Sequence, residues 1–176
     1  MLSKIYRKSI LTLTLALVYA FFVSTGWAFP ASDFSLKSLD GQTISSSSLR
    51  GKVVVLAFGA SWLPLSKSHV LGIQKLADQY SGHGVEVFWV STDSASPKSK
   101  NFATDDQVRT FAERNGLRVK VLRDPDGVVS KTLGVDQLPA VVVIDKQGNA
   151  VDAPVGGIDS NNNFADRVSM LLSKAF

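Results

Sequence analysis

The chain lacks cysteine altogether and has few of the other side chains that reactive sites use most. Its 176 residues include 0 Cys, 2 His and 2 Met. The absence of thiols excludes disulfide bonds, thiolate nucleophiles, thiolate metal ligands and a lipid anchor on cysteine. The two histidines, His69 and His83, have no acidic residues beside them at a metal-ligand spacing. We therefore expect neither a metal site nor a cofactor.

A large excess of one charge is also missing once the first 28 residues are set apart. The chain has 19 Lys and Arg against 15 Asp and Glu. Three of the basic residues and none of the acidic ones lie in residues 1–28, which leaves 16 against 15 in the remainder. The basic residues form no continuous stripe. The sequence therefore does not favour a nucleic-acid partner.

The first 28 residues have the three-part pattern of a secretory leader. Basic residues come first, an apolar run follows at 10–23, and small residues precede the end at Ala28. This pattern predicts a signal peptide over 1–28, cleavage after Ala28, and an exported, periplasmic or otherwise extracytoplasmic domain over 29–176. The alternative is an uncleaved membrane anchor over residues 10–28, near the lower length limit for spanning a bilayer. Membrane contact is expected only through that segment.

Strands and helices alternate along the remaining chain. Continuous apolar runs predict strands buried on both faces at 53–58, 85–90 and 140–144. Helical spacing and turn residues predict further elements: helices at 65–80, 105–115, 128–133 and 164–175, a short strand at 119–122, a loop at 45–48, and hairpins at 34–44 and 145–155. This order indicates an α/β domain with parallel βαβ units and an antiparallel edge.

Five stretches of the chain carry a family resemblance. They are Phe34-x-Leu36 with Asp40-Gly41, Leu49-x-Gly51-Lys52-Val53-Val54-Val55, Phe58 to Lys67, Val90 to Asp93, and Asp124 to Gly148 with Leu138-Pro139. Together they resemble the TlpA/ResA-type, or redoxin (AhpC/TSA-like), branch of the thioredoxin superfamily. The resemblance implies a thioredoxin-like fold over 29–176: a central mixed sheet flanked by helices, with an N-terminal β-hairpin extension. It also implies thiol-disulfide or peroxide-related oxidoreductase activity, and a cis-proline at Pro139 facing the active-site helix.

The residues that would carry this chemistry are changed. By resemblance, Leu63 and Ser66 stand at the two places of the family's Cys-x-x-Cys motif. Ala57 stands where the family usually has an acid or amide, and His69 where it often has an acid. Only a thiolate attacks a disulfide, and neither leucine nor serine supplies one. The resemblance therefore implies a degenerate active site at Leu63 and Ser66 with no confirmed catalytic residue.

The Ser66 hydroxyl and the His69 imidazole could still form a different kind of site. The two residues are three apart in the predicted helix, so they can share one face. A serine nucleophile with a histidine base is conceivable, but no orienting acid or oxyanion device follows from the spacing. The alternative is that both are solvated residues of the first helical turns. His83, between two glycines, is expected to be a turn residue.

The best candidate for function is an apolar segment at the former motif. Trp62, Leu63, Pro64 and Leu65 follow one another directly. By resemblance they lie at the surface, beside Leu138 and Pro139. An exposed apolar patch often marks a partner site, and a peptide can add a strand beside such a loop. The alternative is that Trp62 and Leu65 pack inward and only stabilise the helix start.

These observations favour an exported thioredoxin-fold protein that has lost dithiol redox chemistry. Its expected role is to bind a protein partner or peptide segment with the former active-site face. One alternative is a family-type oxidoreductase that acts without its own cysteines or with thiols of a partner. Another is a mainly structural domain of a larger envelope complex.

Overall fold

The computed structural model describes residues 29–30, 33–64, 66–156 and 164–176. The predicted leader over 1–28 and the candidate residue Leu65 therefore lie outside the described residues. The described elements are β1 (Phe29–Pro30), β2 (Ser35–Ser38), β3 (Thr43–Ser45), the 3₁₀ helix η1 (Ser46–Leu49), β4 (Val53–Gly59), α2 (Ser66–Gln79), β5 (Val85–Ser91), α3 (Asp105–Arg114), β6 (Lys120–Arg123), α4 (Val128–Thr132), β7 (Ala140–Ile144), β8 (Asn149–Ala150), β9 (Val155–Gly156) and α5 (Phe164–Ala175). Within this part of the chain, no helix is both long and apolar enough to cross a bilayer.

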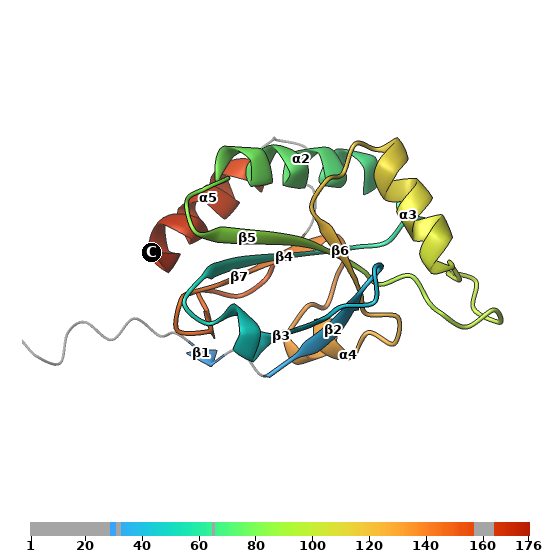
Figure 1. The fold of residues 1–176 in the computed structure, drawn as a ribbon, viewed down its shortest axis with the longest axis horizontal. Helices are drawn as coiled ribbons and strands as arrows, with labels where there is room; N and C mark the ends of the chain where they lie inside the picture. Colours follow the sequence, from blue (N-terminus) through green and yellow to red (C-terminus); the bar gives the residue numbers. More distant parts are fainter. Residues whose placement is uncertain (1–28, 31–32, 65, 157–163) are drawn as a thin grey trace, which may run out of the picture.

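The strands form one mixed sheet (Figure 1). In the described residues its order is β1-β8-β7-β4-β5-β6-β2-β3, and β9 pairs with β7 as well. Strands β4, β5 and β6 run parallel, whereas β7 runs antiparallel to β4. The β2–β3 hairpin adds to β6 at one side of the sheet. The predicted mixed sheet with an N-terminal hairpin is thus confirmed.

Two local expectations need correction. The third buried strand, β7, runs antiparallel to β4, so the parallel units include only β4, β5 and β6. Alternation of strands and helices predicts the order of elements, but it does not fix the direction of each strand. The predicted loop at 45–48 is largely the 3₁₀ helix η1, because Ser45 and Ser48 cap each other's backbone N–H groups in a capping box.

The core lies on both faces of the sheet because β4 is buried along its whole length. Its alternate residues face opposite ways. Val53, Val55 and Ala57 pack with buried residues of α2, α3 and α5, whereas Val54, Leu56 and Phe58 pack with the N-terminal hairpin and α4. Figure 1 shows the same two layers, with α2 and α5 on one side of the sheet and α4 on the other. The continuous apolar run of β4 is explained by this double burial.

One end of the sheet gathers the segments of the former motif. Parallel strands β4 and β5 end at the same edge. The turn 60–64 leaves β4 there and leads into α2, and the loop 94–104 leaves β5 there and leads into α3. Strand β7 begins at this edge too, because its first residue, Ala140, pairs with Phe58 near the end of β4. The fold therefore places the turn 60–64 and the Leu138–Pro139 segment, which leads into β7, side by side.

Candidate functional site at the carboxyl end of β4

A tight turn carries the former motif. The Leu63 backbone N–H donates to the Ala60 carbonyl at 3.3 Å, and the Ser66 N–H donates to the Leu63 carbonyl at 3.1 Å. Trp62 is 49% exposed, Pro64 is exposed and Leu63 is half-buried. An inward-packed Trp62, the alternative considered from sequence, does not fit this exposure. The turn thus presents an aromatic and a proline side chain to solvent.

Ser66 and His69 are buried, so the expectation that they are solvated is wrong. Each side chain is only 2% exposed. They lie on the inner face of α2 because His69 is three residues after Ser66 and four residues before Ile73, a core residue. The Ser66 hydroxyl donates to the Ala60 carbonyl. Its proton is therefore directed at a backbone oxygen in a closed site, which does not support a serine nucleophile.

His69 packs at the end of β4, beneath the turn. Burial lowers the pKa of His69 from 6.5 to about 4, so the imidazole is neutral at ordinary pH. A Cβ at Gly59 would lie 3.1 Å from Trp89 Nε1 and 3.4 Å from His69 Nδ1. Glycine at position 59 thus lets both rings approach the strand closely. Trp89 in turn stacks on Phe111 of α3, with ring centroids 5.6 Å apart.

The segment before β7 completes the site. The Leu138–Pro139 peptide bond is cis, as the resemblance implied. Leu138 is half-buried, and Pro139 is buried. Because Ala140 pairs with Phe58, Pro139 lies beside the end of β4 that leads into the turn. The structure therefore brings the Leu138–Pro139 segment next to the Trp62 turn.

Comparisons with known proteins agree with this architecture. The AhpC/TSA family model matches residues 28–153, which is most of the chain. This chain belongs to the AhpC/TSA family. It is 32% identical over 126 residues to the thioredoxin-like protein YneN of Bacillus subtilis, covering 72% of this chain and 69% of YneN. It is 29% identical over 126 residues to the thiol-disulfide oxidoreductase ResA of Bacillus thuringiensis, covering 72% and 68%.

A solved structure supports the same fold. A putative thiol:disulfide interchange protein DsbE from Chlorobium tepidum superposes with a TM-score of 0.69 at 23% identity. The match covers 86% of this chain and 99% of that one. The thioredoxin-like fold predicted from the sequence is thereby confirmed.

The side chains at this site supply no thiol chemistry. Ala57 is fully buried and pairs with Val141 and Trp89 in the neighbouring strands. It offers no group that could take or give a proton near Ser66. Leu63 is a hydrocarbon, and the chain has 0 Cys anywhere. The scaffold of a dithiol enzyme is present, and its dithiol is not.

The structure reveals one residue at the site that sequence reasoning did not assign a role. The Asp93 side chain is completely buried and accepts hydrogen bonds from both the backbone N–H and the hydroxyl of Ser61. Asp93 holds the first residue of the Trp62 turn in this way. The sequence indicates only that Asp93 lies near the carboxyl end of a strand, two residues after β5, and not which residue it contacts.

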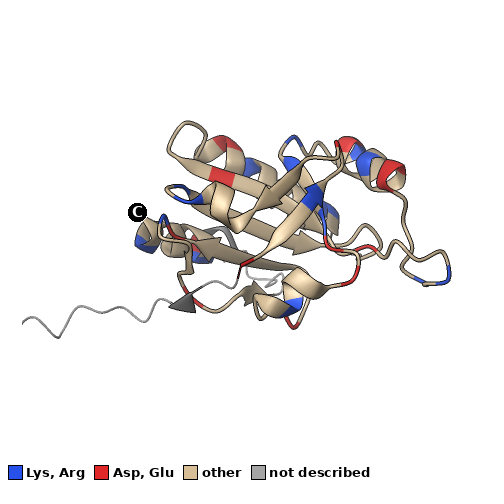
Figure 2. Cartoon of the chain, turned by 60° about the horizontal axis from the view of Figure 1, so that its bottom comes forward, with Lys and Arg blue, Asp and Glu red and all other residues tan. Residues whose placement is uncertain are grey.

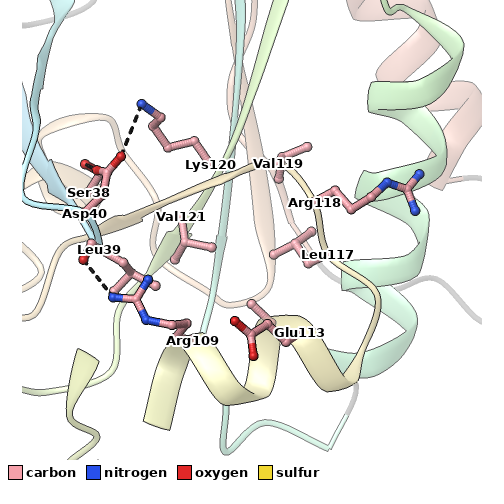
Figure 3. Close-up of a pocket in the computed structure, with 11 residues that line it drawn as sticks. Ser38, Leu39, Asp40, Arg109, Glu113, Leu117, Arg118, Val119, Lys120 and Val121 are labelled. Carbon is pink, nitrogen blue, oxygen red and sulfur yellow. Dashed lines mark hydrogen bonds and ion pairs between the residues drawn. The ribbon is translucent and has the colours of Figure 1, made fainter. Parts of the chain in front are cut away.

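Two hollows elsewhere offer weaker candidates. An open groove of about 550 Å³ lies between Ser61 and α3. A pocket of about 320 Å³ lies on another face of α3 (Figure 3). Its cations already have partners: Arg109 donates to the Leu39 carbonyl at 2.9 Å, and Lys120 lies 3.8 Å from Asp40.

The second pocket therefore does not have the free positive charge of an anion site. A hydrogen bond from Ser38, together with Lys120, lowers the pKa of Asp40 and keeps that carboxylate charged. Within the described ranges, no group of three or more His, Cys, Asp and Glu side chains could hold a metal ion.

Proposed function

We propose that this chain is an exported member of the AhpC/TSA family that has lost dithiol redox chemistry and binds a protein partner. The binding surface, called here the Trp62 surface, consists of Trp62, Leu63, Pro64, Leu65, Leu138 and Pro139. The observation that carries the proposal is Trp62, which is 49% exposed on a hydrogen-bonded turn beside the cis Leu138–Pro139 segment. Its indole would bury a large apolar area when a partner covers it.

Energetics favour binding as the use of this surface. Tryptophan is enriched among the residues that dominate interface energies, each of which can contribute about 2 kcal/mol or more. An exposed aromatic residue beside an exposed proline adds apolar area that water solvates poorly. A partner strand could also use the backbone beside Pro139, as in strand addition to a sheet edge. Each of these features serves binding and needs no thiol.

The first experiment tests the loss of redox chemistry. A second candidate function is family-type oxidoreductase activity, either without cysteines of its own or with thiols of a partner. The names of the relatives favour oxidoreductase activity as such. Insulin reduction and peroxide consumption by the purified protein should not exceed the blank, because no thiolate is present to attack either substrate. A rate that rises in proportion to protein concentration would refute the proposed loss.

The second experiment tests binding at the Trp62 surface. Extracts of the cells that produce the protein are passed over the native protein, Trp62→Ala and Leu71→Ala. Leu71 is a matched control because it is 52% exposed on α2 and lies outside the Trp62 surface. We expect Trp62→Ala to lower capture of a specific partner by roughly tenfold or more, and Leu71→Ala to leave it unchanged. Equal capture by both variants would count against this surface.

Export is tested by the mature N-terminus. The proposal rests on the leader pattern of residues 1–28, which lie outside the described residues. Protein isolated from its native cells should begin at Phe29 and fractionate outside the cytoplasm. Protein that begins at Met1 and sediments with membranes would instead favour the anchor alternative over 10–28.

A further inference from the structure

The Trp62 turn is tied to the end of β5 by a buried carboxylate. Asp93 lies two residues after β5 and is 0% exposed. Its oxygens accept from the Ser61 N–H at 3.0 and 3.1 Å, from the Ser61 hydroxyl at 2.6 Å and from the Ser91 hydroxyl at 2.8 Å. Hydrogen bonds to a charged group are stronger than neutral ones. Asp93 therefore fixes the position of the residue that precedes Trp62.

The same network reaches the far end of the loop 94–104. Arg123 is 8% exposed and donates to the Ser91 hydroxyl at 2.6 Å and to the Ala103 carbonyl at 2.9 Å. It also forms an ion pair with Asp105 at 2.9 Å, where α3 begins. One buried guanidinium thus joins the last residue of β5 to the end of the loop, and Ser91 links it to Asp93.

The loop has an ordered backbone of its own. Ser94 N–H donates to the Asn101 carbonyl at 2.9 Å, and Ala103 N–H donates to the Ser94 carbonyl at 3.0 Å. Figure 1 shows the loop after β5 reaching out beyond α3. Because β4 and β5 are parallel neighbours, the loop and the Trp62 turn leave the same edge of the sheet. The two segments can contact one partner.

The loop presents uncompensated positive charge. Lys98 and Lys100 are exposed, and neither forms an ion pair with another described residue. The tip of the projecting loop is blue in Figure 2. The acids at its base are already engaged, Asp93 by Ser61 and Ser91, and Asp105 by Arg123. Phe102, 37% exposed, adds an apolar contact beside these charges.

We propose that the partner surface extends from the Trp62 turn onto the loop 94–104, with Asp93 as the positioning residue between them. Its occupant is a protein segment that carries acidic side chains beside an apolar residue. This inference rests on the proposed function and names the chemistry of its partner. An anionic membrane fits less well, because two lysines add only about 1 kcal/mol each at a lipid surface, and lipid-binding sites use larger basic clusters.

Photo-crosslinking from three single positions tests the extent of the surface. Benzoylphenylalanine replaces Trp62, Lys98 or Lys131 in the full chain, produced in its native cells. Lys131 is the matched control, an exposed lysine on α4 that forms no ion pair with described residues. The same protein should be crosslinked from positions 62 and 98, and not from 131. Crosslinking from 62 alone would overturn this inference and leave the proposed function standing, whereas none from either would overturn both.

Charge reversal tests the acidic character of the partner. Lys98→Glu with Lys100→Glu should lower the yield from position 62 by about tenfold, and Lys131→Glu should not change it. Raising the salt about tenfold, which shortens the Debye length about threefold, should lower the native yield as well. Unchanged yields would refute an acidic partner. Lysine-dependent sedimentation with phosphatidylserine vesicles, with no protein adduct, would assign the surface to lipid instead.

Two substitutions of buried carboxylates, one at Asp93 and one at Asp124, test the positioning role of Asp93. Asp93→Asn should speed hydrogen exchange of the Ser61 amide by roughly tenfold or more and lower crosslinking from position 98, because the carboxylate then no longer organises both segments. Asp124→Asn is the control, since Asp124 is 3% exposed and accepts the Val129 and Ser130 amides at 3.1 and 2.7 Å. Asp124→Asn should change hydrogen exchange only in α4. An Asp93→Asn protein with native exchange and native crosslinking would refute the positioning role.

Discussion

Ser66 occupies a buried position at the start of α2, and there it makes a hydrogen bond instead of a disulfide. Its hydroxyl is held by the Ala60 carbonyl, and its neighbours Ala57 and His69 are also buried. A charged group would be costly in such surroundings. Ser66, Ala57 and His69 thus form a buried group whose one imidazole is neutral at ordinary pH.

Restoring the two thiols should restore disulfide formation. Residues 63 and 66 lie three apart on a hydrogen-bonded turn, a spacing that holds Cα atoms within about 7 Å, close to the range that a disulfide spans. Leu63→Cys with Ser66→Cys should form an intramolecular disulfide on mild oxidation and gain measurable insulin-reducing activity. Mass spectrometry after alkylation measures the bond. Each single variant is the control and should show neither property, and a double variant that stays reduced would contradict a retained scaffold.

His69 should make stability depend on pH. Its pKa is lowered to about 4 in the folded state from 6.5, so folding favours the neutral ring. This contribution is fully present above about pH 6.5 and is lost as the pH falls toward 4. Linkage gives a loss of about 2 kcal/mol in unfolding free energy between neutral pH and about pH 5. Urea unfolding at the two pH values measures it.

The control for this pH effect is the other histidine. His69→Gln should flatten the pH dependence between these values, whatever its absolute stability. His83→Gln should keep the native slope, because His83 is exposed in a turn. A native slope in His69→Gln would assign the effect to other groups.

Burial of His69 could have been predicted from the sequence, and the role of Asp93 could not. His69, Ile73, Leu76 and Tyr80 are spaced by four, three and four residues, which is one face of a helix. This spacing favours burial over the alternative of a solvated His69. The Asp93 contact to Ser61 joins residues 32 apart in sequence. Such a contact depends on the alignment of two strands, which local pattern does not contain.

At the scale of elements, α3 is fixed at its first turn by reciprocal hydrogen bonds. Gln107 N–H donates to the Thr104 hydroxyl at 3.2 Å, and Thr104 N–H donates to the Gln107 side chain at 2.8 Å. Thr104→Ala should lower the unfolding free energy by about 1 kcal/mol, the usual contribution of such a cap. Denaturant unfolding measures the change. Ser173→Ala is the control, because that hydroxyl bonds only the Met170 carbonyl within α5, and a similar loss there would contradict a capping effect.

Elements with strong apolar patterns were predicted best. The bounds of β7 and α5 agree with the structure, because each element has a clear apolar run or helical stripe. The helix predicted at 105–115 is α3, which ends one residue earlier, at Arg114, with Asn115 as its C-cap. The hairpin predicted at 145–155 has a single returning strand, whereas the structure divides that strand into β8 and β9. Short edge strands depend on pairing partners more than on their own residues.

At the scale of the whole molecule, the N-terminal hairpin is part of the core and not an appendage. Phe34 and Leu36 are buried with Leu49 and Phe58 beneath the sheet. Backbone bonds also link the hairpin to η1, since Ser46 N–H donates to the Phe34 carbonyl at 3.0 Å. A chain without cysteine, and so without disulfides, relies on such packing for its stability. The hairpin should therefore unfold together with the sheet.

Phe34→Ala tests this cooperativity. Phe34 is 6% exposed, so its truncation leaves a cavity in the lower layer and should lower the unfolding free energy by about 3 kcal/mol. Circular dichroism and tryptophan fluorescence should still report one coincident transition. Trp89 lies in the opposite layer from Phe34, so coincidence of the two signals shows that both layers unfold together. Phe176→Ala is the control, since Phe176 is 56% exposed; its effect should stay within about 0.5 kcal/mol. If Phe34→Ala instead separated the two signals, the hairpin and the core layer that contains Phe34 would unfold as an independent unit. The Trp62 surface would then depend only on the layer that contains α2, α3 and α5.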